Sequence, residues 1–240
     1  MSGHSKWATT HRQKELVDAK RGAIFTKLAN NISIAARKGG DPNTNAALRT
    51  AVDKAREANM PKDNVERAIK KGTGELDGVQ VEELYYEGLG PVGLQVIVKS
   101  ITDNKNRSAS TIRHIFTKAG GAFGSVMWNF SQKGVFMITQ EELDAKKISF
   151  DDLELELIDN GAEDIKKEEE GVTIYTALPD FQKMEDFLSV KNIKTESGEI
   201  EYIAKEKLTL SDEDKEKAEK FIGDLEDNED VSDYYINADL

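Results

Sequence analysis

The sequence has no cysteine among its 240 residues. This absence excludes disulfide bonds, thiolate nucleophiles and cysteine-ligated zinc sites, and it is compatible with a reducing compartment. No stretch approaches the roughly 20 apolar residues that a membrane span requires, and the first residues lack the apolar core of a signal peptide. We therefore expect a cytoplasmic protein that does not associate with membranes.

Histidine is also scarce, with only His4, His11 and His114 in the chain. No metal-binding, nucleophilic or phosphate-loop motif includes them. The neighbouring acids at 151–152 and 168–170 fall at an expected helix start and an expected hairpin tip, where charged surface residues are common. The sequence therefore predicts no catalytic residue, no metal site, no cofactor and no small-molecule substrate, which argues against an enzyme.

Positive charge is scarce in one half of the chain only. The net charge is −12, yet residues 1–72 hold 15 Lys and Arg against 7 Asp and Glu, whereas residues 134–240 hold 12 against 32. Residues 88–133 contain six basic residues and a single acid, Asp103. Two basic segments and one acidic half are thus hidden behind the whole-chain charge.

The first forty residues are the most distinctive basic segment. Residues 2–12 show neither a helical nor a strand period, which predicts an arm. Residues 18–38 have apolar side chains at helical spacing and are followed by two glycines, which predicts an amphipathic helix. At about 100° per residue, Lys20, Lys27 and Lys38 fall on nearly one line beside the apolar stripe and would form a basic ridge.

Such a ridge suits a polyanion, because each Lys or Arg near a phosphate releases condensed counterions, and an aromatic in a basic arm can stack on bases. The alternative is a solvated helix face. A second basic face is expected on the helix that follows the polar loop at 103–107. The candidate nucleic-acid-binding residues are His4, Lys6, Trp7, His11, Arg12, Lys14, Lys20, Arg21, Lys27, Lys38, Arg107, Arg113 and Lys118.

Three capped helices are expected in a basic N-terminal domain over residues 1–78. The second helix begins after Asn45, a good N-cap, and the third begins at Pro61 and is expected to end at Gly72. Glycines at 74 and 78 indicate a linker.

The rest of the chain alternates between strand and helix patterns, and the predicted fold class is α+β. A middle domain over 79–133 shows strand, strand, helix and a strand at Val126–Phe130. An acidic domain over 134–204 has the order βαββαβ, which is the ferredoxin-like split arrangement. The helix that starts at Ser211 and a final strand lie in 205–240 and would complete the middle domain, so that the acidic domain is inserted in it.

Several segments together resemble the YebC/PmpR family, and they occur in the family's order along the whole chain. These segments are GHSKWA (3–8), DAKRGAIFTKLA (18–29), NMPKDNVERAIKKG (59–72), YEGLGPVG (86–93), TDNKNR (102–107) and GSV (124–126). The resemblance implies an N-terminal helical domain and two α+β domains, the third inserted in the second. The chain departs from the family in a less basic stretch at 8–14 and a shorter glycine-rich loop at 120–124.

The resemblance also implies a cytoplasmic DNA-binding regulator of transcription. Other members of the family imply a different target, because they resemble ribosome-associated factors that bind ribosomal RNA and help translation through proline runs. A third interpretation is a protein–protein adaptor that uses the acidic half. For the acidic half itself, competition for the basic ridge, orientation on an anionic target and simple solubility are all open.

Overall fold

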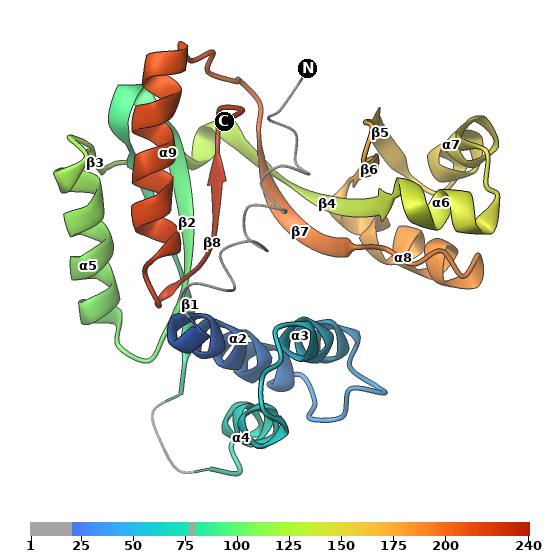
Figure 1. Ribbon diagram of the computed structural model, residues 1–240, viewed down its shortest axis with the longest axis horizontal. Helices are drawn as coiled ribbons and strands as arrows, with labels where there is room; N and C mark the ends of the chain where they lie inside the picture. The colour runs from blue at the N-terminus through green and yellow to red at the C-terminus, as the bar shows by residue number, and fades with distance from the viewer. Residues whose placement is uncertain (1–20, 77–79) are drawn as a thin grey trace. The chain divides into compact units, whose positions relative to one another are not determined.

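The structure is a computed structural model and describes residues 21–76 and 80–240 (Figure 1). The described residues form two compact units, one containing residues up to Met127 together with Lys207–Leu240, and the other containing Trp128–Glu206. The first unit holds a helical bundle and a sheet, and the second unit holds a sheet with its own helices. The predicted α+β fold class is confirmed.

The bundle consists of three helices: α2 (Arg21–Ala36), α3 (Ala46–Glu57) and α4 (Lys62–Thr73). Each contributes buried apolar side chains to one core, among them Ile32, Leu48 and Val65. Asn45 caps α3 as predicted, because its side-chain oxygen accepts a hydrogen bond of 3.1 Å from the backbone N–H of Leu48. This cap fixes where the second helix starts.

The glycine that was expected to end α4 has a different role. Gly72 lies inside the helix, and the left-handed residue that ends it is Gly74, with φ of 80°. A Cβ atom at position 72 would lie 2.3 Å from the carbonyl oxygen of Ser33 on α2. Close approach of the two helices requires the glycine at 72, and the helix stop follows two residues later.

The first sheet is antiparallel and has the order β3-β1-β2-β8. Two helices pack on one of its faces around a core that includes Val96, Phe116 and Phe221 (Figure 1). The strand β8 comes from the C-terminus and pairs with β2, as the predicted insertion requires. The elements are β1 (Glu82–Leu89), η2 (Pro91–Gly93), β2 (Gln95–Thr102), α5 (Lys105–Lys118), β3 (Ala122–Phe123), α9 (Asp212–Glu226) and β8 (Val231–Ile236).

The prediction of a strand at Val126–Phe130 is wrong. The third strand of this sheet is instead the two-residue β3, and the chain turns through a short 3₁₀ helix, η3 (Met127–Asn129). The carboxylate of Glu87 accepts hydrogen bonds of 2.8 Å from the backbone N–H groups of both Val126 and Met127. These bonds occupy donors that a strand would use for its ladder, so the chain turns here.

The second unit has the strand order β5-β6-β4-β7, all antiparallel, which is the predicted split βαββαβ arrangement. One helix, α6, was not predicted; Thr139 caps it by accepting a hydrogen bond of 3.1 Å from the N–H of Glu142. The elements are β4 (Phe130–Thr139), α6 (Gln140–Lys146), α7 (Phe150–Asp159), β5 (Ala162–Lys167), β6 (Gly171–Thr176), η4 (Leu178–Asp180), α8 (Phe181–Val190) and β7 (Ser197–Ala204).

The chain enters and leaves this unit at one place. Buried Asn129 donates from its side-chain amide to the carbonyl of Glu206 and accepts from the N–H of the same residue, both at 2.9 Å. The next pair, the N–H of Lys205 and the carbonyl of Asn129, is bonded at 2.7 Å. Hydrogen bonds within the inserted segment therefore hold its two ends together.

Candidate nucleic-acid interface

Seven of the predicted binding residues lie outside the described part of the chain, and so does the side chain of Arg21. Their contribution to binding stays a prediction. The seven are His4, Lys6, Trp7, His11, Arg12, Lys14 and Lys20.

The middle residue of the predicted ridge, Lys27, is half-buried where α2 meets the end of α9. Its ammonium donates a hydrogen bond of 2.5 Å to the carbonyl oxygen of Glu226, the last residue of α9. Burial lowers the pKa of Lys27 to about 8, against the opposing effect of the acids Glu226, Asp227 and Asp233. A cation at this place complements the negative end of the helix dipole.

The same side of α2 holds the bundle against the first sheet through polar contacts. Asn30 donates from its side-chain amide to the carbonyl of Ile101 at 3.2 Å, and Ser232 donates from its hydroxyl to the side-chain oxygen of Asn31 at 2.8 Å. Arg37 donates to the carbonyl oxygen of Val81. The side of α2 on which the basic ridge was expected is therefore in part covered by contacts with the first sheet and with α9.

Lys38, the last lysine of the predicted ridge, is exposed. It lies just beyond the end of α2, in the connection to α3. That connection packs on the last turn of α4, because a Cβ atom at Gly40 would lie 2.7 Å from the side chain of Thr73 and 3.5 Å from that of Ile69. The structure thus brings Lys38 to the end of the bundle where α4 also ends.

Two of the three candidates on α5 pair with carboxylates. Arg107 binds buried Asp230 with two hydrogen bonds of 3.1 and 2.7 Å and also binds Asp103 at 3.1 Å. The hydrogen bonds to Asp230 raise the pKa of Arg107. Lys118 pairs with Asp224 of α9 at 2.8 Å. Both residues connect α5 with the C-terminal part of the first unit.

Arg113 is the third candidate on α5, and its side chain is exposed. Its guanidinium lies 5.1 Å from the centre of the Phe123 ring, a cation–π contact with β3. Within the described ranges no carboxylate forms an ion pair with it. The guanidinium is therefore free to bind an anion while it rests on the ring.

Sequence reasoning missed the cations on the outer side of α4. Arg67, Lys70 and Lys71 follow one another on the last two turns, and Arg67 and Lys70 are exposed. Neither a carboxylate nor another acceptor of the described residues pairs with any of the three. The apolar pattern could have revealed them, because burial of Val65 and Ala68 fixes the opposite face of α4 as the outer one.

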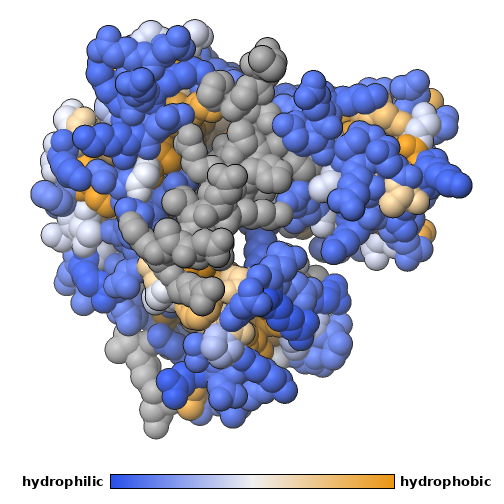
Figure 2. Space-filling view, in the orientation of Figure 1, coloured by the Kyte–Doolittle hydropathy of each residue, from blue (hydrophilic) through white to orange (hydrophobic). Residues whose placement is uncertain are grey.

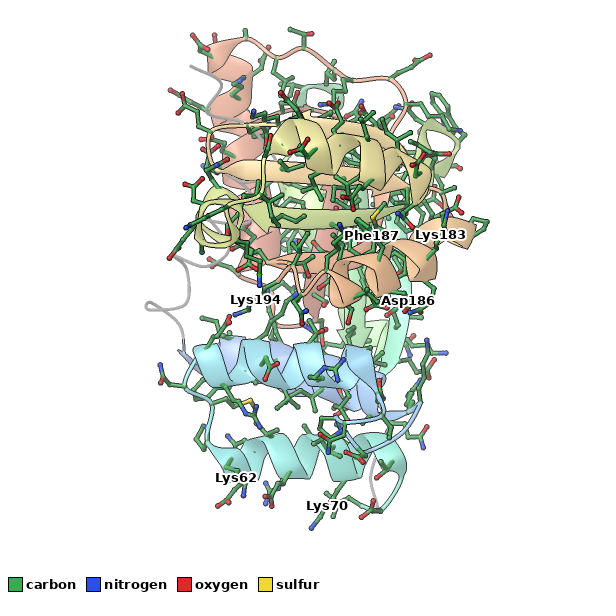
Figure 3. All side chains as sticks on the ribbon, turned by 90° about the vertical axis from the view of Figure 1, so that its right-hand side faces the viewer. Lys62, Lys70, Lys183, Asp186, Phe187 and Lys194 are labelled. Atoms are coloured by element: carbon green, nitrogen blue, oxygen red, sulfur yellow. The ribbon has the colours of Figure 1, made fainter. Side chains whose placement is uncertain are left out.

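Together with Lys38, these residues form what we call the basic end of the bundle: Lys38, Arg67, Lys70 and Lys71. Figure 3 shows that Lys70, like Lys62 at the other end of α4, points away from the rest of the bundle. Residues 21–76 contain 11 Lys and Arg against 6 Asp and Glu, so the excess of positive charge is local. Cations that form no ion pair with a described residue suit a phosphate backbone.

The chemistry of this surface is electrostatic. In the part of the chain that the structure describes, no group of three His, Asp or Glu side chains could hold a metal ion. The described helices also include none that is long and apolar enough to cross a membrane. The basic end offers charge and hydrogen-bond donors, which bind anions.

Two family models match the chain, one over its N-terminal part and one over the remainder. Residues 5–75 match the TACO1/YebC protein N-terminal domain, and residues 81–238 match the TACO1/YebC second and third domain. Most of the sequence is covered by these two matches.

Several curated relatives are similar over the full length. A protein of Thermoanaerobacter pseudethanolicus and one of Caldanaerobacter subterraneus are each 46% identical over 100% of this chain, covering 98% and 99% of their own lengths. Both carry the name "probable transcriptional regulatory protein". A crystal structure of a conserved hypothetical protein from Aquifex aeolicus, 39% identical, superimposes with a TM-score of 0.78 over 92% of this chain and 91% of that one.

Proposed function

Because the chain belongs to the TACO1/YebC family, we propose that it is a non-enzymatic regulator of gene expression that binds nucleic acid. The first target that we propose is DNA, in keeping with the names of the relatives. The protein would act in the cytoplasm, without a cofactor, a small-molecule substrate or a membrane.

The observation that supports this proposal is the basic end of the bundle. Arg67 and Lys70 leave α4 on the side opposite the core, and Lys71 is half-buried on its flank. None of the three has a carboxylate partner among the described residues. Lys70 and Lys71 also complement the C-terminal end of the helix dipole, but that effect is worth only about 0.3–1 kcal/mol at the surface. Contact with phosphates would use the same charges without disturbing the fold.

Contacts of this kind read phosphates and not bases. Lys and Arg side chains that project from a helix into solvent position a protein on nucleic acid, whereas sequence is read by side chains that reach base edges in a groove. The same surface therefore suits ribosomal RNA, and the alternative function is that of a ribosome-associated translation factor that relieves stalling, for example at proline runs.

The test is a triple variant, Arg67→Gln, Lys70→Gln and Lys71→Gln, which keeps good helix formers on α4. We expect weaker binding to a DNA duplex and to a ribosomal RNA fragment, with the log–log salt slope reduced by roughly 0.7–0.9 for each lost phosphate contact. Fluorescence anisotropy at several salt concentrations gives the slope.

A matched control removes the same charge from the acidic C-terminal helix: Lys215→Gln, Lys217→Gln and Lys220→Gln on α9. This control should leave the salt slope unchanged. If the salt slope fell by the same amount in both triple variants, binding would follow net charge alone and the basic end would not be the site.

DNA and ribosomal RNA are separated by two retention assays on the wild type and the α4 triple variant. Co-sedimentation with ribosomes that the variant loses would favour the translation function. Promoter-specific retention on DNA that the variant loses would favour the transcription function. Binding of neither polymer at physiological salt would contradict both.

A further inference from the structure

The helix α7 of the second unit exposes apolar side chains to solvent. Leu155 is 69% exposed and Ile158 is 53% exposed, while Leu153 and Leu157 are buried on the opposite side of the same helix. At about 100° per residue, Ile158 lies only about 60° from Leu155 around the helix, so the two form one apolar strip.

Carboxylates surround this strip. Asp151, Asp152 and Asp159 lie within about 60° of Leu155 around the helix axis, and α7 contains no Lys or Arg. No ion pair with a described residue neutralises these three side chains. The surface of α7 is therefore an apolar centre with an uncompensated acidic rim.

The cations that approach α7 from α8 are already engaged. Lys183 donates a hydrogen bond of 2.7 Å to the backbone carbonyl of Asp159, and Lys191 pairs with Glu156 at 2.5 Å. Both contacts join α7 to α8. They leave the acids beside Leu155 and Ile158 available to another molecule.

A single exposed leucine on a protein surface needs no explanation. Here two large aliphatic side chains lie one turn apart on a helix, and each is more than half exposed. Figure 2 shows hydrophobic residues reaching the surface among hydrophilic ones in the region of α6 and α7. An apolar strip bounded by charge of one sign is typical of surfaces that bind an amphipathic segment.

We propose that the outer face of α7 is a docking surface for a basic amphipathic segment of a partner protein. Aliphatic side chains of that segment would pack on Leu155 and Ile158, and its Lys or Arg side chains would pair with the surrounding carboxylates. Residues 134–204 contain 7 Lys and Arg against 19 Asp and Glu, so the whole domain attracts a cationic partner and repels nucleic acid.

The probe for this surface is a synthetic 14-residue amphipathic peptide of leucine and lysine, added to the full chain. Methyl NMR should show shifts at Leu155 and Ile158 and none at Ile200, which is exposed on β7 of the same unit. Shifts that spread evenly over the exposed methyl groups, or that miss α7, would overturn the proposal.

A double variant, Leu155→Ser with Ile158→Ser, should lower the affinity for the peptide at least tenfold. The matched control is Ile200→Ser, which removes one exposed aliphatic side chain elsewhere in the unit and should leave affinity unchanged. Thermal unfolding checks that both variants fold, which we expect because the replaced side chains are largely exposed. Equal affinity of wild type and double variant would overturn the proposal.

Two further comparisons test the chemistry of the partner. A second double variant, Asp152→Asn with Asp159→Asn, should bind the peptide more weakly and with a smaller salt dependence. A leucine–glutamate peptide of the same length should not bind, and its binding would contradict the proposed charge match. Self-association of the wild type that the serine variant loses would identify a second copy as the occupant and overturn the proposal.

This inference does not depend on nucleic-acid binding. The triple variant of α4 should bind the leucine–lysine peptide as tightly as the wild type, and the serine variant of α7 should keep its affinity for nucleic acid. A failure of one site therefore leaves the other testable.

Discussion

At the scale of single residues, two arginines of α5 differ in what surrounds their guanidinium groups. Arg107 binds the carboxylate of Asp230, which is only 4% exposed, whereas Arg113 rests on the ring of Phe123 and faces solvent. The Arg107 side chain is 46% exposed, but its removal would leave the buried carboxylate of Asp230 without its partner, which costs more than the pair itself contributes. The first arginine therefore stabilises the fold, and the second is available for binding.

We predict that Arg107→Ala lowers the free energy of unfolding by about 2–4 kcal/mol, because Asp230 loses its partner. Arg113→Ala should lower it by about 1 kcal/mol or less, the size of an exposed cation–π contact. Urea unfolding of the two variants measures the difference. Equal stabilities would show that the contact with Asp230 does not hold α5 in place.

Lys27 gives a prediction for pH. Its pKa is about 8 in the folded protein and near 10.5 without burial. Between these values the unfolded chain binds one more proton at this residue, so its contribution raises the free energy of unfolding as pH increases. Relative to Lys27→Met, the wild type should gain up to about 3 kcal/mol over that range.

Urea unfolding of both proteins from pH 7.5 to 10.5 measures this gain, because other titrations cancel in the difference. Lys62→Met, at a side chain that is 87% exposed, is the control for the loss of one positive charge. Parallel stability curves for wild type and Lys27→Met would contradict a buried ammonium at this position.

At the scale of elements, the contact between α2 and α4 depends on the absence of a side chain at Gly72. The same contact is held by a hydrogen bond of 2.9 Å from the hydroxyl of Ser33 to the carbonyl of Ala68. Gly72→Ala would place a methyl group 2.3 Å from the carbonyl oxygen of Ser33. We predict a loss of about 1–3 kcal/mol, because the helices must separate.

Gly22 on α2 provides a control, because its replacement by alanine should change the stability in the opposite direction. A Cβ atom at Gly22 would have no neighbour within 4 Å, so Gly22→Ala should stabilise the helix by about 0.5–1 kcal/mol. Thermal unfolding of both variants is the measurement. If Gly72→Ala were also stabilising, close packing would not be the reason for the glycine.

At the scale of the whole molecule, the inserted unit supplies nearly all of the net negative charge. Trp128–Glu206 contains 9 Lys and Arg against 20 Asp and Glu, and its removal would change the net charge from −12 to −1. Hydrogen bonds between Asn129 and Glu206 join the two ends of this unit. A short Gly-Ser linker can therefore replace the unit without stretching the chain.

We predict that this shortened protein folds and binds nucleic acid more tightly than the full chain at low salt, because the repulsive field of the insertion is gone. The difference should vanish as salt approaches physiological strength, where the Debye length is about 8 Å. Filter binding at 20 and 150 mM salt measures both effects. Equal affinity at low salt would mean that the acidic unit is held where its charge has no effect on the target.

The kinds of elements and their order can be predicted from the amino-acid sequence. Local signals were sufficient for the start of α3 at Asn45 and for the start of α9 at Ser211, whose hydroxyl accepts a hydrogen bond of 3.3 Å from the backbone N–H of Asp214. Periodicity identified the βαββαβ order of the second unit and the return of the C-terminus to the first sheet. These features depend on residues within a few positions of one another, which a sequence shows directly.

Which side chains are available for binding depends on how distant elements pack against one another. Lys27 and Lys38 look alike in the sequence, but the first binds the end of α9, 199 residues away, and the second is exposed. The role of Gly72 was mispredicted for the same reason, since its surroundings are set by α2. Helical period gives the angle of a side chain around its own helix, whereas packing between distant elements decides what that side chain meets.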